Sequence, residues 1–326
     1  MNILYGIQGT GNGHLSRAES IYKLLSTKAD KVDVLLSGNN YSLTPHVPIK
    51  YRNKGLTFVI NNGKIDYIKT LANLDVFTSY IEQKNIPFKD YDIIITDFEP
   101  ITAWASLRFK IPSIHISHQA SFLEKNVPRP ESRNILGEYI MKYFCPTNDY
   151  IGLHYKSYGP SISEPVISNE VMSLSCVVGD HVSVYLPWFD DDHLVSIFSK
   201  IKDVKFCIFS KKTKSFNSFK NIDFYPIEKI SFLENIRTSC GVISNAGFQT
   251  SSEVLYLGKR LIVIPIKGQY EQLCNVAALN KIGVKSLNDL SENLNGIILE
   301  WLDSQPIKLN FQNTLDRLLI QKINNL

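Results

Sequence analysis

Residues 240–279 read CGVISNAGFQTSSEVLYLGKRLIVIPIKGQYEQLCNVAAL, and this stretch decides the fold of the chain. Its apolar runs predict buried strands at Gly241–Ile243 and Leu261–Ile266, each followed by a helix. A turn of small residues, Ser244–Gly247, joins the first strand to its helix, and a loop with Gly268 follows the second strand. The stretch therefore predicts one β-α-β-α unit of an α/β protein with a parallel sheet.

The turn at Ser244–Gly247 predicts an anion-binding site. Backbone N–H groups at a helix N-terminus lack partners within the helix, and the aligned peptide dipoles favour a phosphate there by about 0.3–2 kcal/mol. Gly247 lets the backbone approach a ligand, and Thr250, Ser251 and Ser252 add hydroxyl donors in the first helical turn. The turn and the start of this helix therefore suit a phosphate group.

Glu253 follows on the same helix, within reach of whatever carries the phosphate. A carboxylate that accepts two hydrogen bonds from a vicinal diol gains about 1.5–3 kcal/mol per bond, so a ribose is its natural partner. Taken alone, Glu253 is more simply explained as a complement to the helix dipole. The ribose interpretation is favoured by Tyr270–Gln272 and Asn275, because loops after neighbouring parallel strands converge on one crevice.

The stretch resembles the donor-binding signature of GT-B glycosyltransferases, which use nucleotide sugars. It is most similar to that of the bacterial transferase that adds N-acetylglucosamine to the undecaprenyl-linked peptidoglycan precursor, and to plant galactolipid and secondary-metabolite transferases. The resemblance spans about forty residues in the correct order and spacing. It implies that Ser244–Gly247 holds the diphosphate, Glu253 the ribose, and Glu271 with Gln272 the sugar hydroxyls.

A glycine-rich turn, Gln8–His14, lies between an expected strand at Asn2–Ile7 and an expected helix at Leu15–Leu25. It is similar to a dinucleotide fingerprint, but His14 stands where G-x-G-x-x-G requires its third glycine, which weakens a nicotinamide site. A P-loop is excluded because no Gly-Lys-Ser/Thr follows. The turn also resembles the first loop of the GT-B family, which implies that the histidine faces the acceptor and the glycines touch the donor phosphates.

The expected donor-binding residues come from both halves of the chain. Ile227, just past a strand, is included because the analogous backbone of the resembled family meets the base. The full set is Gly11, Gly13, Ile227, Ser244, Asn245, Ala246, Gly247, Phe248, Gln249, Thr250, Glu253, Gly268, Gln269, Tyr270, Glu271 and Gln272.

Two carboxylates, Asp97 and Glu99, end the strand expected at Asp92–Thr96, on the face where His14 should emerge. The dipole of the helix that follows stabilises their charge, and one of the two is expected to be only its N-cap. At its own helix N-terminus His14 should be neutral and able to accept a proton. We expect Asp97 to orient His14 or to act as the base, and Glu99 to bind an acceptor hydroxyl.

A second polar pair, His118 and Gln119, leaves the strand expected at Ile111–Ser117. In the resembled family the equivalent loop lines the acceptor pocket. The expected catalytic residues are His14 and Asp97, and the expected acceptor-binding residues are Arg17, Glu99, His118 and Gln119. Whether the base is His14, Asp97 or His118 stays open at this point.

The segment 157–165 carries two prolines and a glycine between apolar runs, and it is the best linker in the chain. It predicts an acceptor-binding domain at 1–160 and a donor-binding domain at 161–326. Following the resemblance, the fold class is GT-B, with two Rossmann-like, doubly wound parallel-sheet domains that face a cleft. A final helix at Leu309–Asn325 is expected to cross back onto the first domain.

Composition is that of a globular protein: 326 residues, 44% hydrophobic and 20% charged, with a net charge of +4. The five cysteines are scattered without C-x-x-C spacing, which favours a reducing cytosol and no metal cluster. The chain shows neither a signal peptide nor an apolar run long enough to span a bilayer. The prediction is a cytoplasmic protein with no nucleic-acid partner and at most peripheral contact with the inner face of the membrane.

The predicted function is an inverting, metal-independent transfer of a sugar from a nucleotide-diphosphate sugar, with UDP favoured, to a hydroxyl of an unidentified glycan, lipid or small molecule. Retaining GT-B enzymes carry two glutamates eight residues apart, whereas Asn245 and Leu261 stand eight residues from Glu253. Asp190–Asp192 read as complements to a helix dipole and not as a metal site, and no cofactor is expected. The alternatives are a UDP-sugar 2-epimerase-like enzyme, a non-catalytic nucleotide- or glycan-binding relative, and a nicotinamide oxidoreductase.

Overall fold

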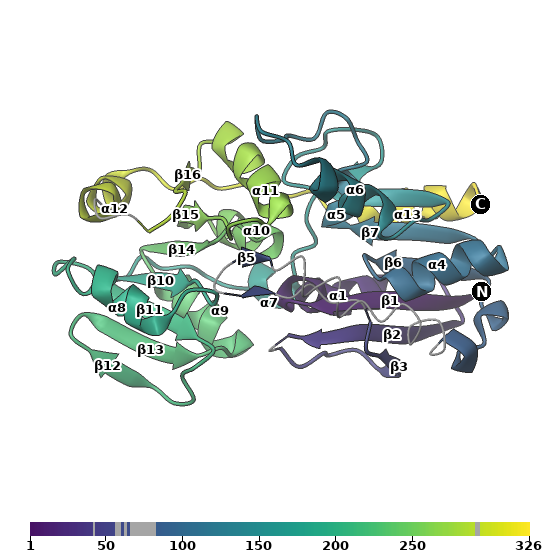
Figure 1. Cartoon of the computed structure of the whole chain (residues 1–326), viewed down its shortest axis with the longest axis horizontal. Coiled ribbons are helices and arrows are strands. Elements are labelled where there is room, and N and C mark those ends of the chain that lie inside the picture. Colours follow the sequence, from purple (N-terminus) through teal and green to yellow (C-terminus); the bar gives the residue numbers. More distant parts are fainter. Residues whose placement is uncertain (42, 56–59, 62–63, 66–82, 291–293) are drawn as a thin grey trace.

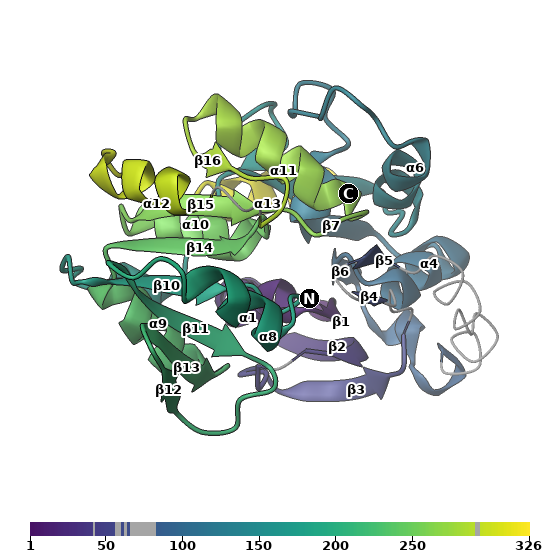
Figure 2. The same cartoon turned by 60° about the vertical axis from the view of Figure 1, so that its left-hand side comes forward.

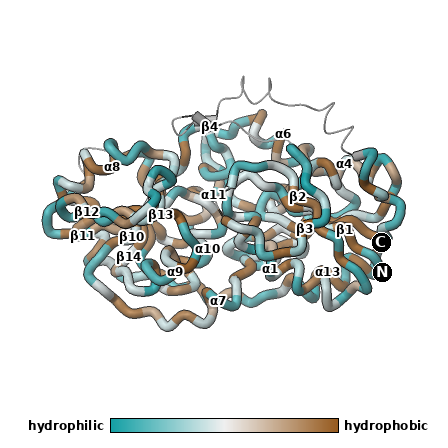
Figure 3. Tube along the Cα trace, turned by 90° about the horizontal axis from the view of Figure 1, so that it is seen from below, coloured by the Kyte–Doolittle hydropathy of each residue, from teal (hydrophilic) through white to brown (hydrophobic). Residues whose placement is uncertain are grey.

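Two parallel β-sheets, one in each half of the chain, organise the protein into two α/β lobes that lie side by side (Figure 1). The computed structural model describes residues 1–41, 43–55, 60–61, 64–65, 83–290 and 294–326. The hydropathy view shows apolar segments along the strands of both lobes and many polar loops around them (Figure 3). The division expected at residue 160 stays a prediction.

The first sheet has the strand order β3-β2-β1-β6-β7-β8-β9, and each neighbouring pair is parallel. Its strands are β1 (Asn2–Thr10), β2 (Lys31–Asn40), β3 (Ile49–Asn53), β6 (Ile93–Asp97), β7 (Ser113–Ser117), β8 (Asp149–Leu153) and β9 (Ile162–Ser163). Every residue of β6 and β7 is buried, as expected for central strands covered by helices on both faces. A short antiparallel pair, β4 (Ile60–Asn61) and β5 (Lys64–Ile65), stands apart from this sheet.

The second sheet has the order β12-β13-β11-β10-β14-β15-β16, and only β12 runs antiparallel to its neighbour. Its strands are β10 (His181–Tyr185), β11 (Lys205–Ser210), β12 (Asn217–Phe219), β13 (Ile222–Pro226), β14 (Gly241–Asn245), β15 (Arg260–Ile264) and β16 (Lys285–Ser286). The β-α-β-α unit predicted at 240–279 is therefore present, with β14 and β15 as its two strands.

Helices and short 3₁₀ turns connect these strands. They are α1 (Asn12–Ser26), η1 (Gln83–Asn85), η2 (Phe88–Asp90), α4 (Pro100–Phe109), α5 (His118–Ser121), α6 (Ile135–Tyr143), α7 (Asn169–Met172), α8 (Asp191–Phe198), α9 (Lys229–Thr238), α10 (Phe248–Tyr256), α11 (Tyr270–Lys281), α12 (Leu294–Asp303) and α13 (Leu315–Asn324). Among these helices none is long and apolar enough to cross a bilayer.

Each sheet has a point where the strand order reverses, and a crevice forms at the carboxyl ends of the strands there. In the first sheet this point lies between β1 and β6, and in the second between β10 and β14. One apolar core runs from Ile3 and Leu15 of the first lobe to Phe248 and Val254 of the second. Because α1 packs on α10, the two crevices lie against each other (Figure 2).

The last helix returns to the first lobe, as the resemblance implied (Figure 1). In α13, Lys322 donates to Asp149 of β8 at 2.7 Å and to Ser161 at 3.0 Å. The helix begins at Leu315 and not at Leu309, where it was expected. Residues 309–314 are not helical, and the side chain of Asn313 accepts a hydrogen bond from the backbone of Leu315.

Two other sequence expectations need correction. The helix after the first glycine-rich turn starts at Asn12, three residues earlier than expected, because Gly11 makes the turn with a φ of 85°. The strand β3 was missed within a polar stretch because it is an edge strand in which exposed and half-buried residues alternate. The sequence of Asp66–Gln83 also predicts a helix, but residues 66–82 lie outside the described part of the chain.

Candidate active site

A cavity of about 260 Å³ lies where the carboxyl ends of the two sheets meet. Its walls come from loops that follow β1 and β7 in one lobe and β10, β11, β14 and β15 in the other. The lining residues with polar side chains are Thr10, Asn12, His14, Arg17, Asn40, Tyr41, His118, Gln119, Tyr185, Trp188, Lys211, Asn245, Gln249, Thr250, Gln269, Tyr270, Glu271 and Gln272. Most of the residues expected to bind donor and acceptor thus line one shared space.

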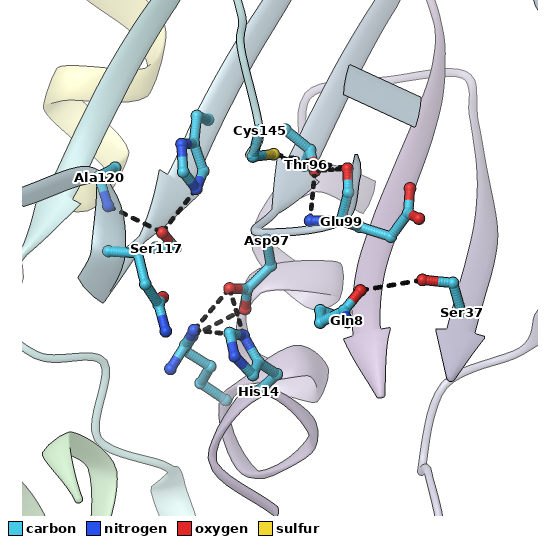
Figure 4. Close-up of polar contacts among 12 residues, drawn as sticks. Gln8, His14, Ser37, Thr96, Asp97, Glu99, Ser117, Ala120 and Cys145 are labelled. Atoms are coloured by element: carbon cyan, nitrogen blue, oxygen red, sulfur yellow. Dashed lines mark hydrogen bonds and ion pairs between the residues drawn. The ribbon is translucent and has the colours of Figure 1, made fainter. Parts of the chain in front are cut away.

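Asp97 holds two basic side chains of α1 at the edge of this cavity (Figure 4). His14 Nδ1 lies 2.7 Å from Asp97 Oδ1, and Arg17 Nε donates to Asp97 Oδ2 at 2.7 Å. A second Arg17 nitrogen, Nη2, donates to Oδ1, so the guanidinium grips both carboxylate oxygens. Asp97 is fully buried, and Arg17 is only 3% exposed.

The hydrogen on the His14 ring is assigned from this network. Asp97 can only accept, so its contact with Nδ1 requires a hydrogen on that atom. Arg17 Nη2 also lies 2.7 Å from Nδ1 and has a second hydrogen besides the one given to the carboxylate, so the contact with the charged carboxylate is taken to decide the tautomer. With Nδ1 protonated, the lone pair sits on Nε2, which bonds to no described residue.

The Asp97 carboxylate stays charged despite its burial. Burial by itself would raise the pKa of Asp97, but Arg17 and His14 beside it outweigh that effect and lower the pKa to about 2. Asp97 therefore keeps His14 in one orientation at any neutral pH.

Glu99 does not reach the cavity, which corrects the expectation that it binds the acceptor. Its carboxylate caps α4 by accepting hydrogen bonds from the backbone N–H groups of Ile101 and Thr102, at 2.9 and 2.7 Å. Asp97 and Glu99 would share a face in a regular strand, but Phe98 between them adopts a left-handed conformation with a φ of 55°. The two carboxylates therefore diverge (Figure 4).

The turn expected to hold phosphate lies at the cavity wall of the second lobe. Gly247 caps α10, and a Cβ built on it would meet no atom within 4 Å, so a ligand has open access to the backbone. The first N–H groups of α10 have no partner in the helix and point toward this space. Ser244 and Ala246 are buried behind it and do not line the cavity, because β14 continues to Asn245.

Four amide side chains around the cavity each present a buried oxygen without a hydrogen-bond partner in the described part of the chain. They belong to Gln119, Asn245, Gln249 and Gln269. In three of them the amide nitrogen is already bound: Gln119 donates to Glu271, Asn245 to the Ile264 carbonyl, and Gln249 to Glu253. These bonds leave the oxygens to accept hydrogen bonds from a ligand.

A second, smaller cavity of about 60 Å³ adjoins the first and shares Asn12, Gly13 and Tyr185 with it. It is lined by Glu253 and Ile227, which are far apart in the sequence and which the resemblance assigns to the ribose and the base. Glu253 Oε1 accepts from Gln249 at 2.8 Å and from Ser16 of the first lobe at 3.2 Å. Burial raises the pKa of Glu253.

The start of α11 connects the two lobes. Glu271 accepts from Gln119 at 2.9 Å, and the hydroxyl of Tyr270 donates to Glu138 of α6 at 2.6 Å. Gln272 lines the cavity, but its side-chain oxygen is used by the backbone N–H of Ile266. Gly268 does not line the cavity.

His118 lines the cavity, but both of its ring nitrogens contact other residues, and the contact of Nε2 joins the two lobes. Nδ1 lies 2.8 Å from the Leu153 carbonyl, and Nε2 lies 2.6 Å from Oδ1 of Asn275 in α11. The ring stacks on Phe248 with centroids 3.9 Å apart, and burial lowers the pKa of His118. Asn275 also donates to the Ala246 carbonyl at 2.9 Å, so this bridge supports the turn at Gly247.

Sequence reasoning missed Asn12, Tyr185, Trp188 and Lys211. Asn12 donates to the Tyr185 hydroxyl at 3.2 Å, and the Lys211 ammonium lies 3.4 Å from the ring centroid of Trp188. The available signal was their position directly after β1, β10 and β11, at or next to a reversal of strand order. In the described ranges no group of three or more metal-ligating side chains comes together.

Several solved structures share the fold of this chain at low sequence identity. The glycotransferase of kitacinnamycin aligns with a TM-score of 0.61 and 12% identity over 93% of this chain and 91% of its own. The spinosyn forosaminyltransferase SpnP aligns with a TM-score of 0.60 and 10% identity over 99% of both chains. UGT89C1 of Arabidopsis thaliana complexed with UDP aligns with a TM-score of 0.59 and 12% identity over 92% of this chain and 90% of its own.

The Arabidopsis protein has also been solved with UDP-L-rhamnose and with quercetin. No curated protein sequence matches this chain. The sequence model of Glycosyl transferase family 1, however, matches residues 1–302. With a match over nearly the whole chain and two parallel-sheet lobes that enclose one cavity, the protein belongs to glycosyl transferase family 1 and is a glycosyltransferase of the GT-B fold.

Proposed function

We propose that this glycosyltransferase moves a sugar from a UDP-sugar to an acceptor hydroxyl, with inversion at the anomeric carbon and without a metal ion. The observation that carries the proposal is the shared cavity. A histidine with a free Nε2, held by Asp97, lines one wall, and the open turn at Gly247 lines the other.

In this mechanism His14 is the general base. The acceptor oxygen attacks the anomeric carbon while its proton passes to His14 Nε2, and the bond from that carbon to the diphosphate oxygen breaks. The electron pair of that bond leaves with UDP. The buried, charged Asp97 stabilises the imidazolium that forms, and the N–H groups at Gly247 stabilise the departing diphosphate.

The two adjoining cavities suit the two parts of a nucleotide sugar. Glu253 and Ile227 in the smaller cavity are placed to meet the ribose and the base. The unpartnered amide oxygens of Gln119, Asn245, Gln249 and Gln269 in the larger cavity are acceptors that sugar hydroxyls would satisfy. UDP and UDP-L-rhamnose in complexes of a protein with the same fold favour uridine as the nucleoside.

The acceptor enters from the side of the first lobe in this proposal. Quercetin in a complex of the Arabidopsis protein supports a small molecule with hydroxyl groups, and the narrower group suggested by the sequence resemblance stays a prediction. Arg17 uses Nε and Nη2 for Asp97, so Nη1 is the nitrogen through which it would meet an acceptor hydroxyl.

The test is binding followed by turnover. We expect UDP and UDP-sugars to raise the melting temperature of the purified protein more than dTDP- or GDP-sugars do, and NADH to leave it unchanged. With an α-linked donor, NMR of the product should show a β-linkage, and activity should persist in EDTA. A retained anomeric configuration would contradict inversion, and hydrolysis to a free epimerised sugar would favour the epimerase alternative.

Glu253→Gln should weaken UDP binding about 10–100-fold, because a neutral amide replaces the carboxylate that accepts from the ribose diol, at about 1.5–3 kcal/mol. Isothermal titration with UDP and with its 2′-deoxy analogue measures the effect. The wild type should lose affinity for the deoxy analogue, and the variant should lose much less. Glu234→Gln, on the exposed face of α9, is the matched control. Equal affinity of Glu253→Gln and wild type for UDP would remove the carboxylate from the ribose site.

A further inference from the structure

Lys211 is a charged residue of the cavity to which the proposed mechanism gives no role. Among the described residues that line the cavity, Arg17 and Lys211 are the only arginine or lysine residues, and Glu271 is the only residue with a carboxylate. Arg17 is neutralised by Asp97, to which it donates two hydrogen bonds. Lys211 forms no ion pair with any described carboxylate, so it is the cation available to an incoming anion.

Lys211 and the turn at Gly247 line the same cavity. It directly follows β11, and the strand order β11-β10-β14 places one strand between it and the strand that leads into the turn. Neighbouring strands lie about 4.8 Å apart, so the two strand ends are separated by about 10 Å. The Lys211 ammonium does not extend away from the sheet, because it lies over Trp188, just past the end of the intervening strand β10.

Trp188 stabilises the Lys211 ammonium group by a cation–π contact when no ligand is bound. An aromatic face attracts an ammonium group and replaces part of its lost hydration. Part of the Lys211 side chain is exposed, but partial desolvation lowers the pKa of its ammonium group, which has no ion pair with a described carboxylate. An anion that binds next to it would supply such a partner.

We propose that Lys211, held over Trp188, binds the diphosphate of the nucleotide sugar and supplies the positive charge opposite the N–H groups of the Gly247 turn. This inference rests on the proposed function and adds a residue to it. When the sugar is transferred, the bond to the diphosphate oxygen breaks and that oxygen gains negative charge. Lys211 stabilises this charge as a hydrogen-bond donor and keeps its proton throughout.

Lys211→Met tests the proposal, and Lys212→Met is its matched control. Both lysines are exposed, but Lys212 pairs with Asp190 at 2.8 Å and does not line the cavity. We expect Lys211→Met to weaken UDP binding about 10–100-fold, the range of one strong charge-assisted hydrogen bond. Uridine, which lacks phosphates, should bind both variants and the wild type within about twofold. Lys211→Arg should recover most of the UDP affinity.

Titration calorimetry of UDP and of uridine at two salt concentrations distinguishes the possible outcomes. Loss of UDP affinity in Lys211→Met with a weaker salt dependence supports the proposal. If Lys211→Met binds UDP as the wild type does, or loses uridine to the same extent, Lys211 does not contact the diphosphate although the proposed function stands. If the wild type binds no UDP while its melting curve shows it folded, both the function and this inference are wrong.

Discussion

Replacing His14 with alanine should lower the rate of sugar transfer about 1,000-fold while UDP affinity stays within about twofold. A positioned general base typically contributes 10²–10⁴ to a rate, and in this protein His14 is the cavity residue whose free nitrogen is oriented by a buried carboxylate. The ion pair between Asp97 and Arg17 remains in the variant, so the strand end keeps its shape.

Single-turnover formation of the glycoside measures this effect without interference from product release. His193→Ala, on the exposed side of α8, is the matched control and should keep full activity. Asp97→Asn should also slow transfer, because an amide no longer stabilises an imidazolium. If His14→Ala retains a tenth or more of the wild-type rate, His14 is not the base, and His118 is not its obvious replacement because both of its ring nitrogens are engaged.

Replacing Arg17 with methionine should lower the free energy of unfolding by about 3–5 kcal/mol, because it leaves the buried Asp97 carboxylate without its cation. The pKa of Asp97 is lowered to about 2, so the stability that its charge contributes is present above the unfolded-state pKa of about 3.9. That contribution is lost as the pH falls through about 2. In Arg17→Met the pKa of Asp97 should rise, and the loss should begin at higher pH.

Urea unfolding at neutral pH and at pH 4 measures this prediction. Arg237→Met is the matched control, because it removes a solvent-screened ion pair with Glu234 and should change the stability far less than Arg17→Met does. The double variant Arg17→Met/Asp97→Leu should regain most of the lost stability, because no charge is left buried. A double variant as unstable as Arg17→Met would show that the loss comes from packing around Arg17 and not from the stranded carboxylate.

Local patterns were sufficient for the secondary structure of residues 240–279. The turn before α10, Glu253 on that helix, and the polar start of α11 all lie within forty residues, and their spacing determines which of them follow β14 and which follow β15. The same reasoning failed where one backbone torsion decides direction. Asp97 and Glu99 look equivalent in the sequence, but the left-handed Phe98 turns one toward His14 and the other into the cap of α4.

No sequence motif identifies the residues that reach the site from other strands. Lys211 and Trp188 stand in no recognisable signature, and they meet only because β11 and β10 are neighbours in the sheet. His118 was expected to contact the acceptor through its polar ring. Its ring lies in the cavity wall, but Asn275, more than 150 positions along the chain, takes up its Nε2.

By itself, the sequence determined the β-α-β-α unit at 240–279, the glycine-rich turn before His14 and the open turn of small residues before α10. These features depend on apolar periodicity, on glycine torsions and on small turn residues, all of which act over a few residues. Only the tertiary structure decided which side chains share the cavity. The packing of α1 on α10 brings together Ser16 and Glu253, and such contacts follow from the burial of apolar surface shared by two lobes.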